Sequence, residues 1–113
     1  MKEKIKELDK ILNTVSIEYL AFQQRENVKK IEKSMPQIQE FVLWFLQGNQ
    51  FGIENDLYQD MCTNLLTILK DMEDALRYDD CVLMHDAVAY GLVEYLELFV
   101  SSEEEEKTID DNV

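Results

Sequence analysis

The chain has 113 residues, of which 46% are hydrophobic, so it is long and apolar enough to form one domain with a core of its own. Its three glycines and one proline are too few for an architecture of strands and tight turns. The formal net charge of −13 disfavours binding to nucleic acid or to an anionic membrane surface, because both depend on lysine and arginine.

The first predicted helix spans residues 2–23. The apolar pattern loses its phase in the polar run 23–27, so we expect a turn there, with Asn27 as the N-cap of the next helix. Up to that point apolar side chains recur at alternating spacings of three and four, which is typical of one buried helix face: Ile5, Leu8, Leu12, Val15, Tyr19 and Phe22.

Charge divides the chain into a basic first part and an acidic remainder. Eight of the eleven basic side chains lie in residues 1–33, whereas residues 34–100 carry a net charge of −10. We expect the first part to pack on the acidic remainder. The alternative is that the acidic surface steers a basic partner.

The second predicted helix spans residues 27–48, and its apolar pattern continues through Pro36. Ser34 and Gln37 also have the spacing of a capping box. Two interpretations therefore stay open: one helix kinked at Pro36, or two helices nearly in line. We expect Gly48 to end the segment in the left-handed region.

The third predicted helix spans residues 55–78, with Asn55 or Asp56 as its N-cap. Asp79 and Asp80 supply a tight turn and the N-cap of the next helix. The apolar face of the third helix is the following set, widened by Leu66, Leu69 and Leu76: Tyr58, Met61, Leu65, Ile68, Met72 and Ala75.

The fourth predicted helix, residues 81–100, is the most apolar and is therefore expected to be central. Gly91 should allow a close approach of another helix. One narrow polar stripe runs along this helix, formed by Asp86, Tyr90, Glu94 and Glu97. We expect the following side chains to be mostly buried: Leu83, Val88, Leu92, Leu96 and Phe99.

These elements predict an all-α fold, a four-helix and mostly antiparallel bundle. Residues 1–100 form the single domain, and residues 101–113 form an acidic, mobile C-terminal tail. Because the four consecutive glutamates of the tail have no apolar face to pack, we expect truncation at Ser101 to leave the fold intact.

No catalytic, cofactor-binding or metal-binding residue can be assigned. His85 is the single histidine, and Val82 stands where a Glu-x-x-His metal motif needs a carboxylate. We expect His85 on a helix flank, hydrogen-bonded or partly exposed. Cys81 lies at a helix N-terminus, which lowers a thiol pKa, but the neighbouring aspartates oppose this effect. No small-molecule substrate is implied.

Cysteine usage and the lack of targeting segments point to a reducing cytoplasm. Along a helix, Cys62 lies about 24 Å from the turn that precedes Cys81, well beyond the roughly 7 Å Cα limit for a disulfide. We therefore expect two free thiols, with Cys62 in the core. We expect no signal peptide, because the first residues are charged and lack the apolar run that a secretion signal needs, and no apolar run is long enough to cross a membrane.

The candidate partner-binding site is the run Phe41 to Leu46, six apolar residues that cover every direction around a helix axis. A helix with one buried face needs a narrower stripe, so part of this run must be covered by the bundle, by a second copy or by a partner. The predicted site consists of Phe41, Trp44, Phe45 and Phe51, because a partly open tryptophan is a common binding anchor.

Residues 56–99 resemble the second half of the flagellin export chaperones. Asp80 and Leu83 match the Asp-x-x-Leu start of the last apolar helix, and Phe99 stands where that family often has tryptophan. The N-terminal half lacks the family's opening tyrosine-rich segment. The chain also resembles small uncharacterised helical proteins of Gram-positive bacteria. The chaperone resemblance implies a cytoplasmic bundle wrapped by the helices of an export client.

The sequence thus predicts a non-enzymatic protein–protein interaction module, a small acidic adaptor or chaperone-like protein. The alternative is a homo-oligomeric structural protein without a client, in which the apolar run pairs with itself. An acidic mimic of nucleic acid is the least favoured interpretation. No nucleic-acid, membrane or cofactor partner is expected.

Overall fold

The computed structural model describes residues 1–22 and 25–100. Gln23, Gln24 and the predicted acidic tail 101–113 lie outside the described residues. The described part contains helices and no strand: α1 (Lys2–Phe22), α2 (Asn27–Leu46), α3 (Asn55–Tyr78) and a last helix. This last helix begins as α4 (Cys81–Ala87), passes through a π-helical turn, η1 (Val88–Leu92), and stays helical over residues 93–100.

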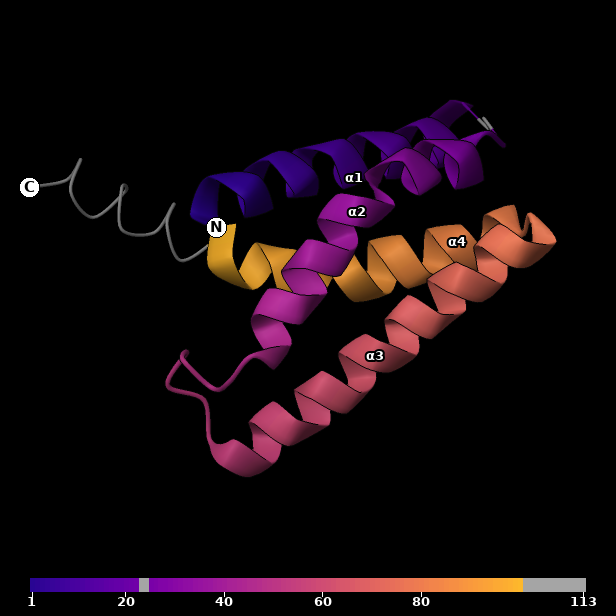
Figure 1. The fold of residues 1–113 in the computed structure, drawn as a ribbon. Helices are drawn as coiled ribbons and strands as arrows, with labels where there is room; N and C mark the ends of the chain where they lie inside the picture. The colour runs from indigo at the N-terminus through magenta and orange to yellow at the C-terminus, as the bar shows by residue number, and fades with distance from the viewer. Residues whose placement is uncertain (23–24, 101–113) are drawn as a thin grey trace, which may run out of the picture.

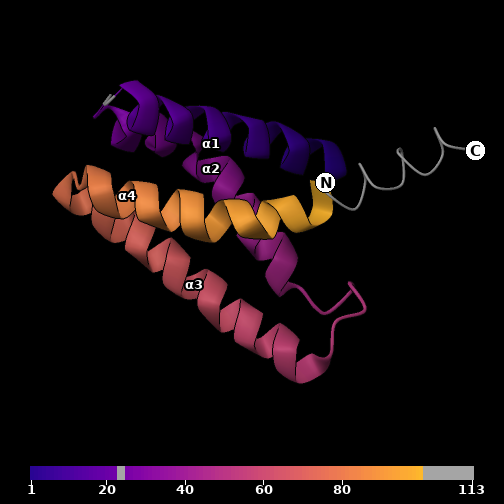
Figure 2. The same ribbon diagram turned by 180° about the vertical axis from the view of Figure 1, so that it is seen from behind.

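Successive helices run in opposite directions, so the predicted four-helix antiparallel bundle is confirmed (Figure 1). The last helix lies between α1 and α3, and α2 crosses it (Figures 1 and 2). Both hairpin connections, α1–α2 and α3–α4, lie at one end of the bundle, hereafter the hairpin end. The α2–α3 loop lies at the opposite end, hereafter the loop end.

The apolar faces predicted for the helices form one continuous core, from which three predicted members are left out: Tyr19, Phe22 and Leu66. Phe22 is 68% exposed because α1 ends there, and Leu66 is 49% exposed. The N-terminal end of α3 diverges from the last helix, so the other helices can cover only a narrow stripe of α3 (Figure 1). The fully buried side chains of largest volume include Phe41, Phe45, Ile5, Leu12, Leu65, Met72, Leu92 and Leu96.

Pro36 lies inside one continuous helix, which decides between the two interpretations left open by the sequence. The axis of α2 changes direction along its length in both views (Figures 1 and 2). Proline removes one backbone hydrogen bond and its ring crowds the preceding turn, so a bend is the expected consequence. Ser34 is buried in mid-helix, and the predicted capping box is wrong.

Three predicted helix ends also differ from the structure. The N-cap residues of α2 and α3 are Glu26 and Glu54, neither with a side-chain capping bond, so Asn27, Asn55 and Asp56 lie within the first turns. The second helix ends at Leu46 rather than at residue 48. The glycine with a positive φ, at 72°, is Gly52 in the following loop and not Gly48.

The connection between α3 and α4 agrees with its prediction. Asp79 adopts the left-handed conformation with φ of 50°, which Asp tolerates better than most residues. The Asp80 carboxylate accepts a hydrogen bond from the backbone N–H of Leu83 at 3.0 Å and caps α4. Farther along, a Cβ added at Gly91 would lie 3.0 Å from the side chain of Ile68, so the glycine does allow a close helix approach.

The last helix is buried as predicted over much of its length. Val88, Leu92 and Leu96 are fully covered, and Leu83 and Phe99 are partly covered. Its predicted polar stripe is exposed throughout. Among the helices that the structure describes, none is both long and apolar enough to cross a membrane.

Candidate functional site

The four residues predicted as a partner site lie together at the loop end. They form part of an aromatic cluster, defined here as Phe41, Trp44, Phe45, Phe51, Tyr58, Tyr95 and Phe99. Trp44, Phe51 and Phe99 contact one another edge to face, with ring centroids 5.2 to 5.4 Å apart. Phe45 stacks on Phe51 at 5.1 Å and on Tyr58 at 5.5 Å. These distances are those of favourable aromatic pairs.

Burial divides the predicted site into a support and an accessible edge. Phe41 and Phe45 are 1% and 0% exposed, so in this conformation they face the protein itself. Trp44 and Phe51 are half-buried against the core. Leu43, the neighbour of Trp44 on α2, is 65% exposed. The accessible edge therefore consists of Trp44, which packs on Phe41, and Phe51, which stacks on Phe45, while Leu43 projects from the same turn of α2.

Two tyrosine hydroxyls of the aromatic cluster form hydrogen bonds with nearby backbone carbonyls. The Tyr58 hydroxyl donates to the carbonyl of Phe45 at 2.6 Å, which satisfies one of the unpaired carbonyls at the end of α2. The Tyr95 hydroxyl donates to the carbonyl of Met61 at 3.2 Å and accepts from the Asn64 side chain at 2.7 Å. Burial, together with the neighbouring Cys62 thiol, raises the pKa of Tyr58 above its ordinary value.

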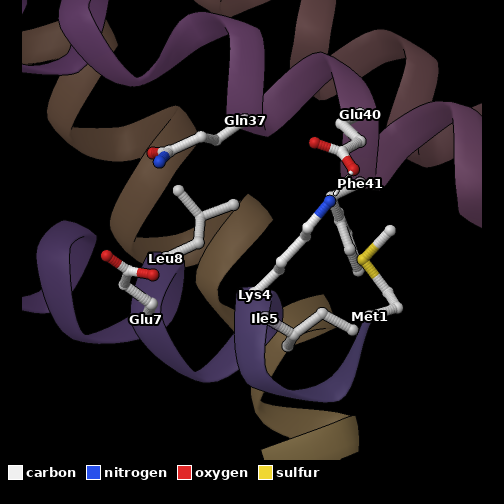
Figure 3. Close-up of a pocket in the computed structure, with 8 residues that line it drawn as sticks. All are labelled: Met1, Lys4, Ile5, Glu7, Leu8, Gln37, Glu40 and Phe41. Atoms are coloured by element: carbon white, nitrogen blue, oxygen red, sulfur yellow. Dashed lines mark hydrogen bonds and ion pairs between the residues drawn. The ribbon is translucent and has the colours of Figure 1, made fainter.

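A small hollow of about 180 Å³ lies between α1 and α2, beside the aromatic cluster, and Phe41 forms part of its wall. Lys4 of α1 and Glu40 of α2 point toward one another across it (Figure 3). Their ion pair measures 2.7 Å between nitrogen and oxygen, and the Lys4 and Glu40 side chains are 67% and 47% exposed. This pair therefore contributes little stability. The hollow offers a partly apolar wall with a polar rim and no reactive group.

A larger hollow, about 390 Å³, lies at the hairpin end and was missed by the sequence interpretation. We call it the hairpin hollow. It is lined by Tyr19 and Arg25 from the first hairpin and by residues 78–82 from the second. Tyr78 and Val82 are 71% and 60% exposed. No periodicity could have revealed this site, because it joins segments that are more than fifty residues apart in the sequence.

His85 lies next to the hairpin hollow, and its predicted environment is wrong. It is 5% exposed, and neither ring nitrogen has a hydrogen-bond partner among the described residues. Its imidazole stacks on Tyr19, with ring centroids 4.6 Å apart, and meets Tyr90 edge to face at 5.6 Å. Because α1 closes over this part of the last helix, the flank expected to be open is covered.

Ser16 and Asn27 surround His85 in a tight polar pocket closed by Val15, Ile31, Met84 and Val88. The Oγ of Ser16 and the Oδ1 of Asn27 are buried and also have no partner in the part of the chain described. The Asn27 side chain instead donates through Nδ2 to the carbonyl of Cys81 at 2.9 Å. The residue predicted to cap α2 therefore links the two hairpins.

The cysteines are separate and free. Cys62 and Cys81 are half-buried, and the Cys81 thiol donates to the Arg25 carbonyl at 3.4 Å. Within residues 1–22 and 25–100, no three His, Cys, Asp or Glu side chains gather as a metal site would require. The accessible features are therefore apolar and aromatic surfaces with acidic neighbours.

Comparisons of the chain with protein-family models, with curated proteins and with solved structures give no match.

Proposed function

We propose that this chain is a non-enzymatic protein-binding module whose partner contacts the outer edge of the aromatic cluster. The observation that carries the proposal is the 65% exposure of Leu43 beside a half-buried Trp44. A tryptophan on rigid support, next to an exposed aliphatic side chain, has the properties of a binding anchor. Ring contacts with Phe41, Phe51 and Phe99 fix its position, so little ordering is needed when a partner binds.

The proposed partner is an amphipathic helix that places apolar side chains over Leu43 and Trp44. Helix-in-groove recognition uses such anchors at helical spacing. The net charge of −13 favours a partner with basic flanks. The resemblance of residues 56–99 to flagellin export chaperones suggests a client class, the helices of an exported protein. Two free cysteines support a cytoplasmic location for this activity.

The alternative is self-association through the same edge, as in a homo-oligomeric structural protein. A second copy would bring another Leu43 and Trp44 to the interface, in the self-complementary arrangement of a two-fold dimer. The same exposed side chains support both interpretations, so the experiment has to measure self-association before it measures client binding.

The test is the substitution Leu43→Ser, with Leu20→Ser as the matched control. Leu20 is 60% exposed, but it lies on α1 toward the hairpin end. Both variants should fold like the wild type, because neither side chain is in the core. Sedimentation velocity at high concentration first establishes whether the wild type is a monomer. A self-association that Leu43→Ser abolishes and Leu20→Ser preserves would establish the homo-oligomer.

If the wild type is monomeric, immobilised wild type and both variants are exposed to an extract of the source organism. A client identified by mass spectrometry is then purified and titrated calorimetrically. The proposal expects binding by the wild type and Leu20→Ser, and a loss of at least about tenfold in affinity for Leu43→Ser, equivalent to about 1.4 kcal/mol. Equal affinities for all three proteins would contradict the proposed site.

A further inference from the structure

The hairpin hollow combines two aromatic side chains with two carboxylates. Tyr19 and Tyr78 line it from opposite hairpins, and Asp79 and Asp80 lie between Tyr78 and α4. The face of a tyrosine ring carries negative electrostatic potential and attracts cations. Carboxylates add a full charge that strengthens this preference. The volume of about 390 Å³ falls within the range of small-ligand sites.

The two aspartates keep oxygen atoms free to accept from a ligand. Asp80 uses Oδ1 for the cap on Leu83, and neither aspartate is in an ion pair within the part of the chain that the structure describes. Arg25 is the one basic side chain in the lining, and it forms no ion pair with either aspartate. The balance of charge in the hollow is therefore negative, which continues the acidic character of residues 34–100.

Contacts between the two hairpins hold the hollow in shape. The Cys81 thiol donates to the carbonyl of Arg25, and the Asn27 amide donates to the carbonyl of Cys81. The stack on buried His85 fixes the Tyr19 ring from the protein side. A site that is already assembled loses less conformational freedom when a ligand enters.

From this arrangement we propose that the hairpin hollow binds the side-chain ammonium group of a lysine in a basic protein segment. The ammonium lies against the Tyr78 and Tyr19 rings, its charge is balanced by Asp79 and Asp80, and its methylene stem packs on Val82. Charge complementarity with the acidic body selects this occupant over an acidic or purely apolar segment. The hollow is at the opposite end from Leu43 and Trp44, so the proposal does not depend on the proposed function.

The test is a titration of the full chain, labelled with ¹⁵N, with a short acetylated and amidated glycine-lysine-glycine peptide. The matched control peptide carries norleucine, which has a similar aliphatic stem and no charge. We expect saturable shifts confined to residues 19, 25 and 78–82, with a dissociation constant on the order of 1 mM. The norleucine peptide should produce no saturable shift.

Two variants make the result specific. Asp79→Asn with Asp80→Asn keeps a residue that tolerates the left-handed conformation and a good N-cap, so the fold should persist. This double variant should weaken lysine-peptide binding at least about tenfold. The matched control, Asp56→Asn with Asp60→Asn, removes the same charge from exposed positions near the start of α3 and should change affinity less than about twofold.

Tyr78→Leu provides an independent measurement, because Tyr78 is 71% exposed and its replacement cannot disturb the core. It should weaken binding about threefold or more, since leucine retains apolar surface without the ring. Three results would overturn the proposal: no saturable shift with the lysine peptide, equal shifts with norleucine, or equal losses in the two double aspartate variants. The last would show that general electrostatic attraction, rather than the hollow, accounts for binding.

Discussion

At the loop end, buried hydroxyl groups have partners, whereas at the hairpin end several buried polar atoms do not. Tyr58 and Tyr95 both donate to backbone carbonyls. Ser16, Asn27 and His85 together leave four buried polar atoms without a hydrogen bond among the described residues. Asn49 Oδ1, in the α2–α3 loop, is the exception at the loop end.

From this contrast we expect the loop end to contribute more to the stability of the fold than the hairpin end. Buried polar groups without partners each cost about 1–3 kcal/mol, and natural proteins tend to keep such costs where a function requires them. The aromatic cluster is packed as a core that leaves one edge accessible. The hairpin end retains a buried histidine beside an open hollow, and a π-helical turn, a feature often found at functional sites, follows in the middle of the last helix.

The largest expected effect is at the centre of the aromatic cluster. Phe45 is fully buried and contacts Phe41, Phe51, Tyr58 and Tyr95. Phe45→Ala should therefore lower the free energy of unfolding by about 3–5 kcal/mol. Urea denaturation followed by circular dichroism measures this loss. A loss below about 1 kcal/mol would show that the loop end is not the stabilising end.

His85→Leu should instead raise the free energy of unfolding. Leucine has a similar volume and no polar atoms to leave unpaired, so the free energy of unfolding should rise by about 1–2 kcal/mol despite the lost contact with Tyr19. The same denaturation experiment provides the value. A variant less stable than the wild type would show that the contacts of the imidazole outweigh the cost of its unpaired nitrogens, and the contrast between the two ends would disappear.

Tyr58→Phe removes a hydrogen bond that is made, and it leaves the aromatic ring in place. We expect a loss of about 1 kcal/mol, since the carbonyl of Phe45 at the end of α2 loses its partner. The thermal midpoint and the urea midpoint should both fall slightly. An unchanged or raised stability would mean that the Tyr58 hydroxyl is not part of what makes the loop end stable.

The smallest effect is a dependence on alkaline pH. The pKa of Tyr58 is raised, first by burial, so the unfolded chain releases the phenol proton at a lower pH than the folded chain does. Its contribution is fully present below the ordinary pKa of about 10 and is lost as pH rises through the folded pKa. The free energy of unfolding of the wild type should therefore fall more steeply than that of Tyr58→Phe above about pH 10. If the stability of the wild type and of Tyr58→Phe fell equally with rising pH, the pH dependence could not be assigned to Tyr58.

The helices, their antiparallel order and most of the core could be predicted from the amino-acid sequence. Apolar spacing of three and four specifies a buried helix face wherever it occurs, and the loss of phase after Phe22 marked the turn between α1 and α2. The tight turn and the N-cap at Asp79 and Asp80 could be predicted because both are local structures that depend on neighbouring residues alone. The predicted helix-end residues Asn27 and Gly48 were wrong: the Asn27 side chain donates to the Cys81 carbonyl of the other hairpin instead of capping α2, and the positive φ is at Gly52.

The contacts of each candidate side chain, in contrast, follow from how the helices pack against one another. Six consecutive apolar residues predicted that part of the run would be covered, but the sequence did not indicate that Phe41 and Phe45 face the core while Leu43 stays exposed. Burial of His85 depends on α1 packing over the last helix, and the hairpin hollow depends on two hairpins meeting at one end. Such long-range contacts leave no periodic signal, because they depend on how whole helices pack rather than on the spacing within one of them.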